Sequence, residues 1–130
     1  MTNAPLEAGD ELDWLVLHHV LDWKRGIAAF GEAPYRWQSQ EFPALWPVSR
    51  DLGCAWRIVD HAIQRDVAVA VLADPAKPPL WRVTFTHPSG SEAHGEAATL
   101  PLAICHAALR AVEAAILVKS AGRIEKKTQL

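Results

Sequence analysis

Six histidines and two cysteines are the residues of this sequence that could bind a metal ion. The adjacent pair His18 and His19 lies in a stretch with helical spacing, where neighbouring side chains point about 100° apart, so the two rings cannot chelate one ion. Chelation from a helix needs two histidines four positions apart, and the sequence has neither such a pair nor a combined cysteine and histidine motif. We therefore expect histidines on helix surfaces and in turns, and no metal site.

A cysteine nucleophile and a pair of acids are the next candidates for chemistry. Cys105 precedes His106, but neighbours on a helix face apart, and Cys105 belongs to an apolar stripe on which a thiol stays protonated. Glu92 and Glu96 share one face of a predicted strand about 13 Å apart, which is wide for a catalytic carboxylate pair. No phosphate-binding glycine loop, dinucleotide-binding glycine motif or serine-nucleophile motif occurs. We therefore expect no enzyme activity and no cofactor.

A helix and an aromatic loop make up the first third of the chain. Apolar residues at helical spacing predict a helix that is capped by Asp10, with Asp13 in the capping-box position, and that ends near Gly26. Residues 26–48 contain three prolines, which predicts a loop without a long element. Because exposed aromatic side chains are costly, we expect this loop to pack on a sheet or a helix, and the alternative is an aromatic-lined binding surface.

A second helix and three strands follow. The predicted helix covers residues 50–65 and is capped by Ser49. Its core-facing stripe comprises Leu52, Ala55, Trp56, Val59, Ala62 and Ile63. The strand at 67–72 is apolar on both faces, which is typical of a central strand. The strands at 81–86 and 92–97 alternate between apolar and polar residues, and the short links predict antiparallel hairpins.

The last helix begins at the cap Thr99 and ends by Gly122. Cys105 lies on its main apolar stripe, and the flanking alanines are small enough for close approach to a sheet or another helix. We expect His106 to lie on the solvent side of this helix, together with Arg110 and Glu113.

These elements predict an α/β fold of the α+β type. Their order is helix–loop–helix–β–β–β–helix, with helices packed on a small antiparallel three-stranded sheet as an α/β/α layered sandwich. Residues 1–9 are expected to form a flexible leader, residues 10–118 a single domain, and residues 119–130 a polar C-terminal tail.

The composition narrows the classes of partner. The chain has 130 residues, of which half are hydrophobic and 22% are charged, as in a globular protein. Its net charge of -2 and the lack of a dense basic patch in the predicted domain disfavour a nucleic-acid partner. The longest apolar runs are far shorter than the roughly 18 residues of a membrane span. Two cysteines without close spacing are expected to stay reduced, which fits the cytoplasm.

Four blocks of the sequence resemble, in order, the phage ABA sandwich domain family. Thr99–Arg110 (TLPLAICHAALR) is similar to the closing helix of that family, and Leu12–Trp23 (LDWLVLHHVLDW) is similar to its opening helix. Trp46–Asp51, followed by Ala55–Val59, resembles a further family block that begins a helix. Trp81–Phe85 (WRVTF) resembles one of its strands.

The resemblance covers about residues 10–117. The chain departs from the family pattern at Arg50, where the family usually has threonine, and in the loop at 75–79, and we expect both departures to lie at the surface. The resemblance implies a small phage or prophage protein with helix, sheet and helix layers. It implies no particular activity.

The expected functional surface combines a polar strand face with the aromatic loop. Its candidate residues are Tyr35, Trp37, Trp46, Arg82, Thr84, Glu92, His94 and Glu96. A three-layer arrangement would cover part of the polar face, whereas a two-layer arrangement would leave it open. An open face of mixed charge suits a protein partner or a small polar ligand.

We therefore expect a non-enzymatic phage or prophage accessory protein that binds a host protein, for example an inhibitor of a bacterial defence system such as an anti-CRISPR. One alternative is a small-ligand or nucleotide-binding module, with an anion at a helix N-terminus near Ser49–Arg50 or Thr99. A further alternative is a nucleic-acid-associated protein. A homodimer is also compatible with the small-residue helix surface and the aromatic residues.

Overall fold

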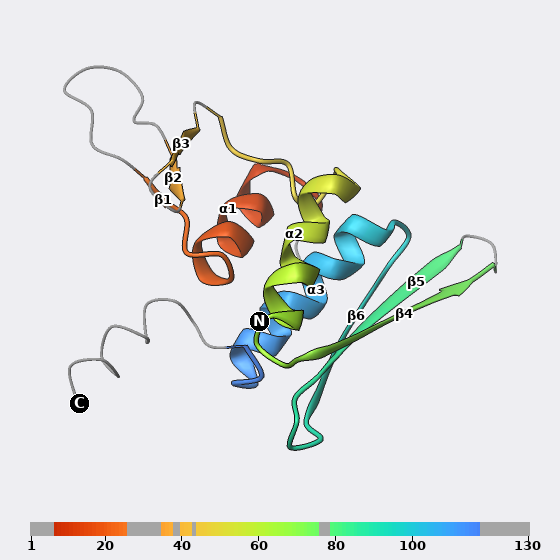
Figure 1. Cartoon of the computed structure of the whole chain (residues 1–130). Coiled ribbons are helices and arrows are strands. Elements are labelled where there is room, and N and C mark those ends of the chain that lie inside the picture. Colours follow the sequence, from red (N-terminus) through yellow and green to blue (C-terminus); the bar gives the residue numbers. More distant parts are fainter. Residues whose placement is uncertain (1–6, 26–34, 38–39, 43, 76–78, 118–130) are drawn as a thin grey trace, which may run out of the picture.

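The computed structural model describes residues 7–25, 35–37, 40–42, 44–75 and 79–117. In these ranges the chain forms three helices and two small sheets (Figure 1). The elements are α1 (Asp10–His19), β1 (Lys24–Arg25), β2 (Tyr35–Trp37), β3 (Gln40–Phe42), α2 (Leu52–Ile63), β4 (Ala68–Asp74), β5 (Leu80–Thr86), β6 (Glu92–Ala97) and α3 (Leu100–Glu113). The α+β class and the predicted order of the second helix, three strands and last helix are confirmed. The predicted tail and most of the predicted leader lie outside the described residues.

The larger sheet has the strand order β4-β5-β6, and both neighbouring pairs are antiparallel. The predicted alternation is confirmed in β5, where Val83 and Phe85 are fully buried, and in β6, where Ala93 and Ala97 are buried between exposed residues. The prediction of a central strand at 67–72 is wrong, because β4 lies at the edge and six of its seven residues are exposed. The apolar character of the β4 side chains therefore did not indicate that they are buried.

Helix α3 occupies the centre of the fold. One side packs on β5 and β6, while α1 and α2 pack on other sides, and Figure 1 shows the sheet, the helices and then the small β1–β3 sheet as successive layers. The predicted close approach is confirmed at Gly95, where an added Cβ would collide with the backbone of Ala103 and Ala107. The predicted solvent position of His106 is wrong: its side chain is buried because neighbours surround this helix. The predicted end at Gly122 lies outside the described residues.

Helix α2 starts and faces differently from the prediction. Asp51, rather than Ser49, is its N-cap, and the Asp51 side chain accepts a hydrogen bond of 3.0 Å from the backbone N–H of Cys54. The buried residues of α2 are Ala55, Ile58, Val59 and Ala62. Three residues assigned to the core stripe, Leu52, Trp56 and Ile63, are exposed instead. The buried stripe is therefore rotated toward Ile58.

Helix α1 is shorter than predicted, and a second sheet follows it. Gly9 is the N-cap, so Asp10 is a helical residue rather than the cap, and the helix ends at His19 before a left-handed residue at Asp22. The predicted end at Gly26 lies outside the described residues. The segment predicted as a loop contains β2 and β3, which pair with each other and with β1 in the order β1-β2-β3. Gly9, assigned to a flexible leader, donates its N–H to Ser49 Oγ at 3.1 Å.

Candidate binding surface

A row of paired polar side chains lies on one face of the larger sheet. Arg82 stands opposite Glu96, and Nε of Arg82 donates to Oε2 of Glu96 at 2.8 Å. Thr84 stands opposite His94, with Oγ1 and Nδ1 2.9 Å apart. The His94 ring also approaches Glu92, with 3.6 Å between Nε2 and Oε1. We call these five residues the polar strand face.

The polar strand face is open in the described part of the chain. Helix α3 packs against the opposite face of β5 and β6 (Figure 1). The buried side chains of Val83 and Phe85 belong to that face. Arg82, Glu92, His94 and Glu96 have side chains that are about half exposed. The backbone beneath them is further fixed because Arg110 of α3 donates to the carbonyl oxygen of His94 at 2.8 Å. Of the two arrangements that the sequence allowed, the open one is found.

The three aromatic residues assigned to the same surface lie elsewhere. Tyr35, Trp37 and Trp46 are half-buried, and they surround the buried ring of Trp23. The centroid of the Trp23 ring is 5.0 Å from that of Trp46, 6.2 Å from Tyr35 and 6.3 Å from Trp37. Helices separate this cluster from the polar strand face (Figure 1). The aromatic segment therefore packs on α1 and its C-terminal extension, as expected, and does not join the polar face.

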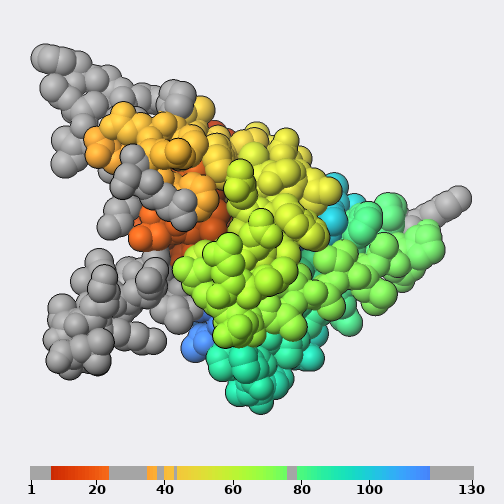
Figure 2. All heavy atoms as spheres, viewed as in Figure 1, coloured from red at the N-terminus to blue at the C-terminus, as the bar shows by residue number. Residues whose placement is uncertain are grey.

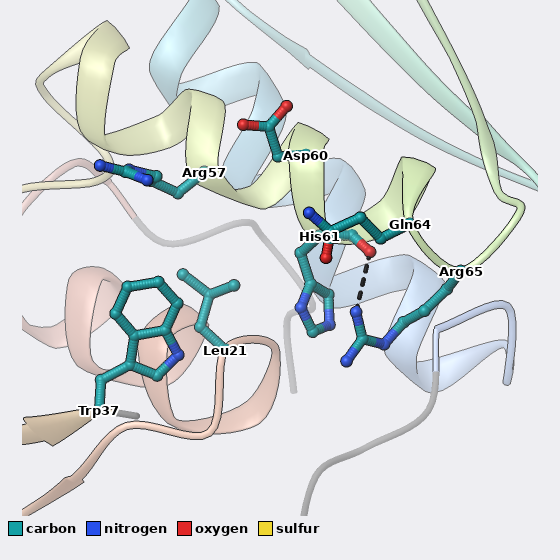
Figure 3. A pocket seen from close by; sticks show the side chains of 7 residues that line it. All are labelled: Leu21, Trp37, Arg57, Asp60, His61, Gln64 and Arg65. Atoms are coloured by element: carbon teal, nitrogen blue, oxygen red, sulfur yellow. Dashed lines mark hydrogen bonds between the residues drawn. The ribbon is translucent and has the colours of Figure 1, made fainter. Parts of the chain in front are cut away.

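A pocket of about 200 Å³ lies between the end of α1, β2 and the outer side of α2 (Figure 3). It is lined by Leu21, Trp37, Arg57, Asp60, His61, Gln64 and Arg65. Figure 3 shows the His61 ring pointing from α2 into the space beside Leu21, and the Asp60 carboxylate pointing away from Trp37. Arg57 also lies over the Trp46 ring, with its Cζ 5.8 Å from the centroid. Arg57 thus brings a cation to an aromatic wall.

This pocket was missed in the sequence. The signal that could have found it is the spacing of polar residues four apart on α2, Arg57 with His61 and Asp60 with Gln64, which places them on one side of the helix. The aromatic wall from β2 could not be assigned to that side, because the sequence predicted no strand there.

The helix-start site near Ser49–Arg50 is already filled by the protein's own acid. The Asp13 side chain is fully buried and accepts hydrogen bonds from the N–H of Ser49 at 2.8 Å, from Ser49 Oγ at 2.5 Å and from Nη2 of Arg50 at 2.7 Å. Arg50 also pairs with Asp10 at 3.1 Å. Hydrogen bonding and attraction to Asp13 raise the pKa of Arg50, so its charge is secure. Arg50 lies at the surface, as expected, and its guanidinium is already paired with Asp13 and Asp10, so no anion is expected here.

The two cysteines have environments that disfavour the thiolate. Burial raises the pKa of the Cys105 thiol far above its ordinary range, as expected for the apolar stripe. Burial, followed by the nearby Asp51, raises the pKa of Cys54 as well. Among the described residues, no group of three or more His, Cys, Asp or Glu side chains is placed to hold a metal ion. Within the same ranges, no helix is both long and apolar enough to span a membrane.

One comparison with known proteins identifies a relationship. The model of the phage ABA sandwich domain family matches residues 14–109, which include most of α1, both sheets, α2 and most of α3. No curated protein and no solved structure matches the chain.

Proposed function

Because the chain belongs to the phage ABA sandwich domain family, we propose that it is a phage or prophage accessory protein that acts by binding a protein in the bacterial cytoplasm, and that it catalyses no reaction. The observation that carries this proposal is the open polar strand face. Its donors and acceptors are held in cross-strand pairs on a sheet whose other face is packed on α3. A preorganised face of this kind loses little side-chain freedom when a partner docks.

The proposed partner is a component of a bacterial defence system, so the protein would be an inhibitor of the anti-CRISPR kind. Support comes from the phage family and from the mixed polar groups on the face, where Arg82 pairs with Glu96 and His94 lies between Glu92 and Glu96 along β6. Complementary charge selects among partners more than it adds affinity. A face that combines a base, acids and hydrogen-bonding groups therefore suits recognition of one protein surface.

A charge swap tests the role of the face without removing its internal pair. The double variant Arg82→Glu with Glu96→Arg keeps an acid opposite a base, but it reverses the pattern that a partner meets. The matched control is Arg36→Glu with Glu41→Arg on the other sheet. These two residues are also opposite each other in antiparallel strands, and Nη2 of Arg36 lies 2.6 Å from Oε2 of Glu41. Both double variants are expected to fold with little loss of stability.

The measurement is phage plating on a defence-active host that expresses each variant, together with recovery of the defence component by the tagged protein. We expect the wild type and the Arg36/Glu41 swap to protect phage and the Arg82/Glu96 swap to fail. Full protection by the Arg82/Glu96 swap would exclude this face, and loss of protection by both swaps would show a general effect of altered charge.

A second candidate function is binding of a small anionic ligand such as a nucleotide, which the pocket beside α2 favours. Trp37 offers a ring for stacking and Arg57 a cation for an anionic group. The pocket volume of about 200 Å³ is below the roughly 300–1,000 Å³ of most ligand sites, so this function ranks second. A rise in melting temperature with a nucleotide, which Arg57→Ala abolishes, would establish it. No rise across a nucleotide panel would reject it.

A further inference from the structure

The large apolar side chains that stay exposed are unevenly distributed among the elements of the fold. In the described part of the chain these residues are Leu52, Trp56, Ile63, Val71, Leu72 and Leu80. They come from α2, from β4 and from the first residue of β5, and none comes from α1, β6 or α3. These elements are neighbours, and a concentration of exposed apolar side chains on neighbouring elements is typical of an interaction site.

Strand β4 forms an edge of the larger sheet. It pairs with β5 along its whole length from Ala68 to Asp74, and no described strand pairs with its outer side. Its first six residues carry no charge and no proline, and the pairing with β5 has no bulge. Natural sheets usually protect an exposed edge with one of these features. An unprotected edge of seven residues is therefore ready to accept another strand.

The two faces of β4 differ in what they present. Val71 stands opposite Val83 and so belongs to the helix side of the sheet, yet it is 39% exposed. Leu72 stands opposite Arg82 on the open side and is 64% exposed. Each face thus places an uncovered apolar side chain in the middle of the strand.

The exposed flank of α2 extends the apolar surface on the helix side. Leu52, Trp56 and Ile63 lie four and seven positions apart, which puts them on one stripe of the helix. Arg57 and His61 are on the opposite flank, which faces α1 and the pocket. Helix α2 also contacts β4. Figure 2 shows α2 and β4 as one continuous surface in the view given.

We propose that a second copy of this chain pairs with β4 in antiparallel orientation, so that two three-stranded sheets form one six-stranded sheet. A two-fold axis at Val71 pairs all seven residues of the strand: Val71 faces its twin, and Leu72 faces Ala70 of the second copy. Directly opposite residues in antiparallel strands point to the same face. The helices of both copies therefore lie on one side of the six-stranded sheet.

Two features favour a second copy of the chain as the partner of β4: the position of the one charged residue of β4, and the charged strands at both ends of the resulting sheet. The charged residue of β4 is Asp74 at its end, and the two-fold axis places it opposite Ala68 of the second copy, away from its twin. The two ends of the six-stranded sheet are then β6 strands, which carry Glu92, His94 and Glu96. Charged side chains on an edge strand oppose further pairing. The assembly would thus stop at two chains.

The mass in solution tests the proposal on the full chain. We expect sedimentation equilibrium to show twice the 14.3 kDa of one chain as the concentration rises. Leu72→Lys should shift the protein toward the monomer, because a lysine at the centre of the edge opposes pairing. The matched control is Thr86→Lys, which places the same side chain on the same open face but one strand inward, opposite Ala68, and it should leave the dimer intact.

A symmetric cross-link tests the pairing independently of these variants. In a Cys54→Ser background, Val71→Cys should form a disulfide-linked dimer on mild oxidation, because each residue faces its twin. Ala73→Cys, which faces Val69 of the second copy, should cross-link much less. A monomer at all concentrations, a dimer insensitive to Leu72→Lys, or equal cross-linking of both cysteine variants would overturn the proposal. A different partner protein on β4 would give the first of these results.

Discussion

The guanidinium of Arg50 lies 2.7 Å from a carboxylate oxygen of Asp13, a residue of α1 whose side chain is fully buried. Ser49 completes the arrangement with its N–H and its hydroxyl group. These contacts tie α1 to the segment that leads into α2, 36 and 37 positions further along the chain. A buried carboxylate is tolerated because its oxygens are paired and hydrogen-bonded.

Arg50→Ala is expected to destabilise the protein, because it leaves the buried Asp13 charge without its cationic partner. Arg36→Ala is the matched control, since Arg36 also pairs with an acid, but its partner Glu41 is exposed and regains water. Chemical denaturation should show a clearly larger fall in the free energy of unfolding for Arg50→Ala. Equal effects of the two variants would contradict the assigned role of the Asp13 pair.

Gly95→Ala is expected to lower the free energy of unfolding by about 1–3 kcal/mol, the usual cost of overpacking a core. The added methyl group would meet the backbone of α3, which cannot rotate away as a side chain can. Gly53→Ala serves as control, because its Cβ would lie 3.2 Å from the movable Asp51 carboxylate. Thermal denaturation of both variants measures the difference in stability. If Gly95→Ala were as stable as the wild type, β6 and α3 would be less closely packed than the structure shows.

Trp23→Ala is expected to cost about 3–5 kcal/mol of stability, as large aromatic truncations in cores do. The Trp23 ring is fully buried, with centroid distances of 4.8 Å to Phe42 and 5.0 Å to Trp46. Trp56→Ala removes an equally large ring that is 42% exposed, so it should cost much less. Urea denaturation followed by circular dichroism measures both. Similar losses would show that the aromatic cluster contributes little to folding.

The two thiols should differ in their reaction with a maleimide. Cys105 is fully buried and Cys54 is partly exposed, so the folded protein should be labelled at one position and the unfolded protein at both. Mass spectrometry of the intact protein counts the labels, and Cys54→Ser should remain unlabelled while folded. Rapid labelling of Cys105 in the folded protein would contradict its assignment as an inert core thiol.

Alkaline pH should destabilise the protein through Cys105. Burial raises the pKa of this thiol in the folded state, so above about pH 8.5, the ordinary thiol pKa, the unfolded chain loses its proton first. The contribution is fully present below that pH and falls as the pH rises. Cys105→Ala should therefore show a shallower alkaline loss of stability than wild type, measured by urea denaturation between neutral and alkaline pH. Parallel losses would exclude this thiol as a cause.

The sequence correctly predicted those parts of the fold in which the local pattern of apolar and polar residues determines which side chains are buried. The alternation in β5 and β6 requires one apolar face, and it placed Arg82, Thr84, Glu92, His94 and Glu96 correctly on the other. The alanines around Cys105 likewise predicted a helix that approaches its neighbours closely. These patterns have their cause in a period of two or 3.6 residues, which the sequence displays directly.

The wrong predictions concern residues whose burial or hydrogen-bond partners are determined by segments far away in the sequence. An apolar strand such as β4 reads as central whether a neighbouring strand covers it or not. His106 is polar, yet it is buried because α3 is surrounded on several sides. Asp13 had the position of a capping residue, but its partner Ser49 belongs to a segment 36 positions away. Strands of two or three residues, as in the small sheet, are too short to show a period.

Gly95 fixes which side chains the larger sheet can display. If β6 slid by one residue along α3, the side chain of His94 or Glu96 would point into the helix backbone. If it slid by two residues, the methyl group of Ala93 or Ala97 would take the place that only a hydrogen atom fits. The glycine therefore acts as a mechanical stop for the strand. The absence of a side chain at Gly95, on the face that packs on α3, thus fixes the register of the charged residues on the polar strand face.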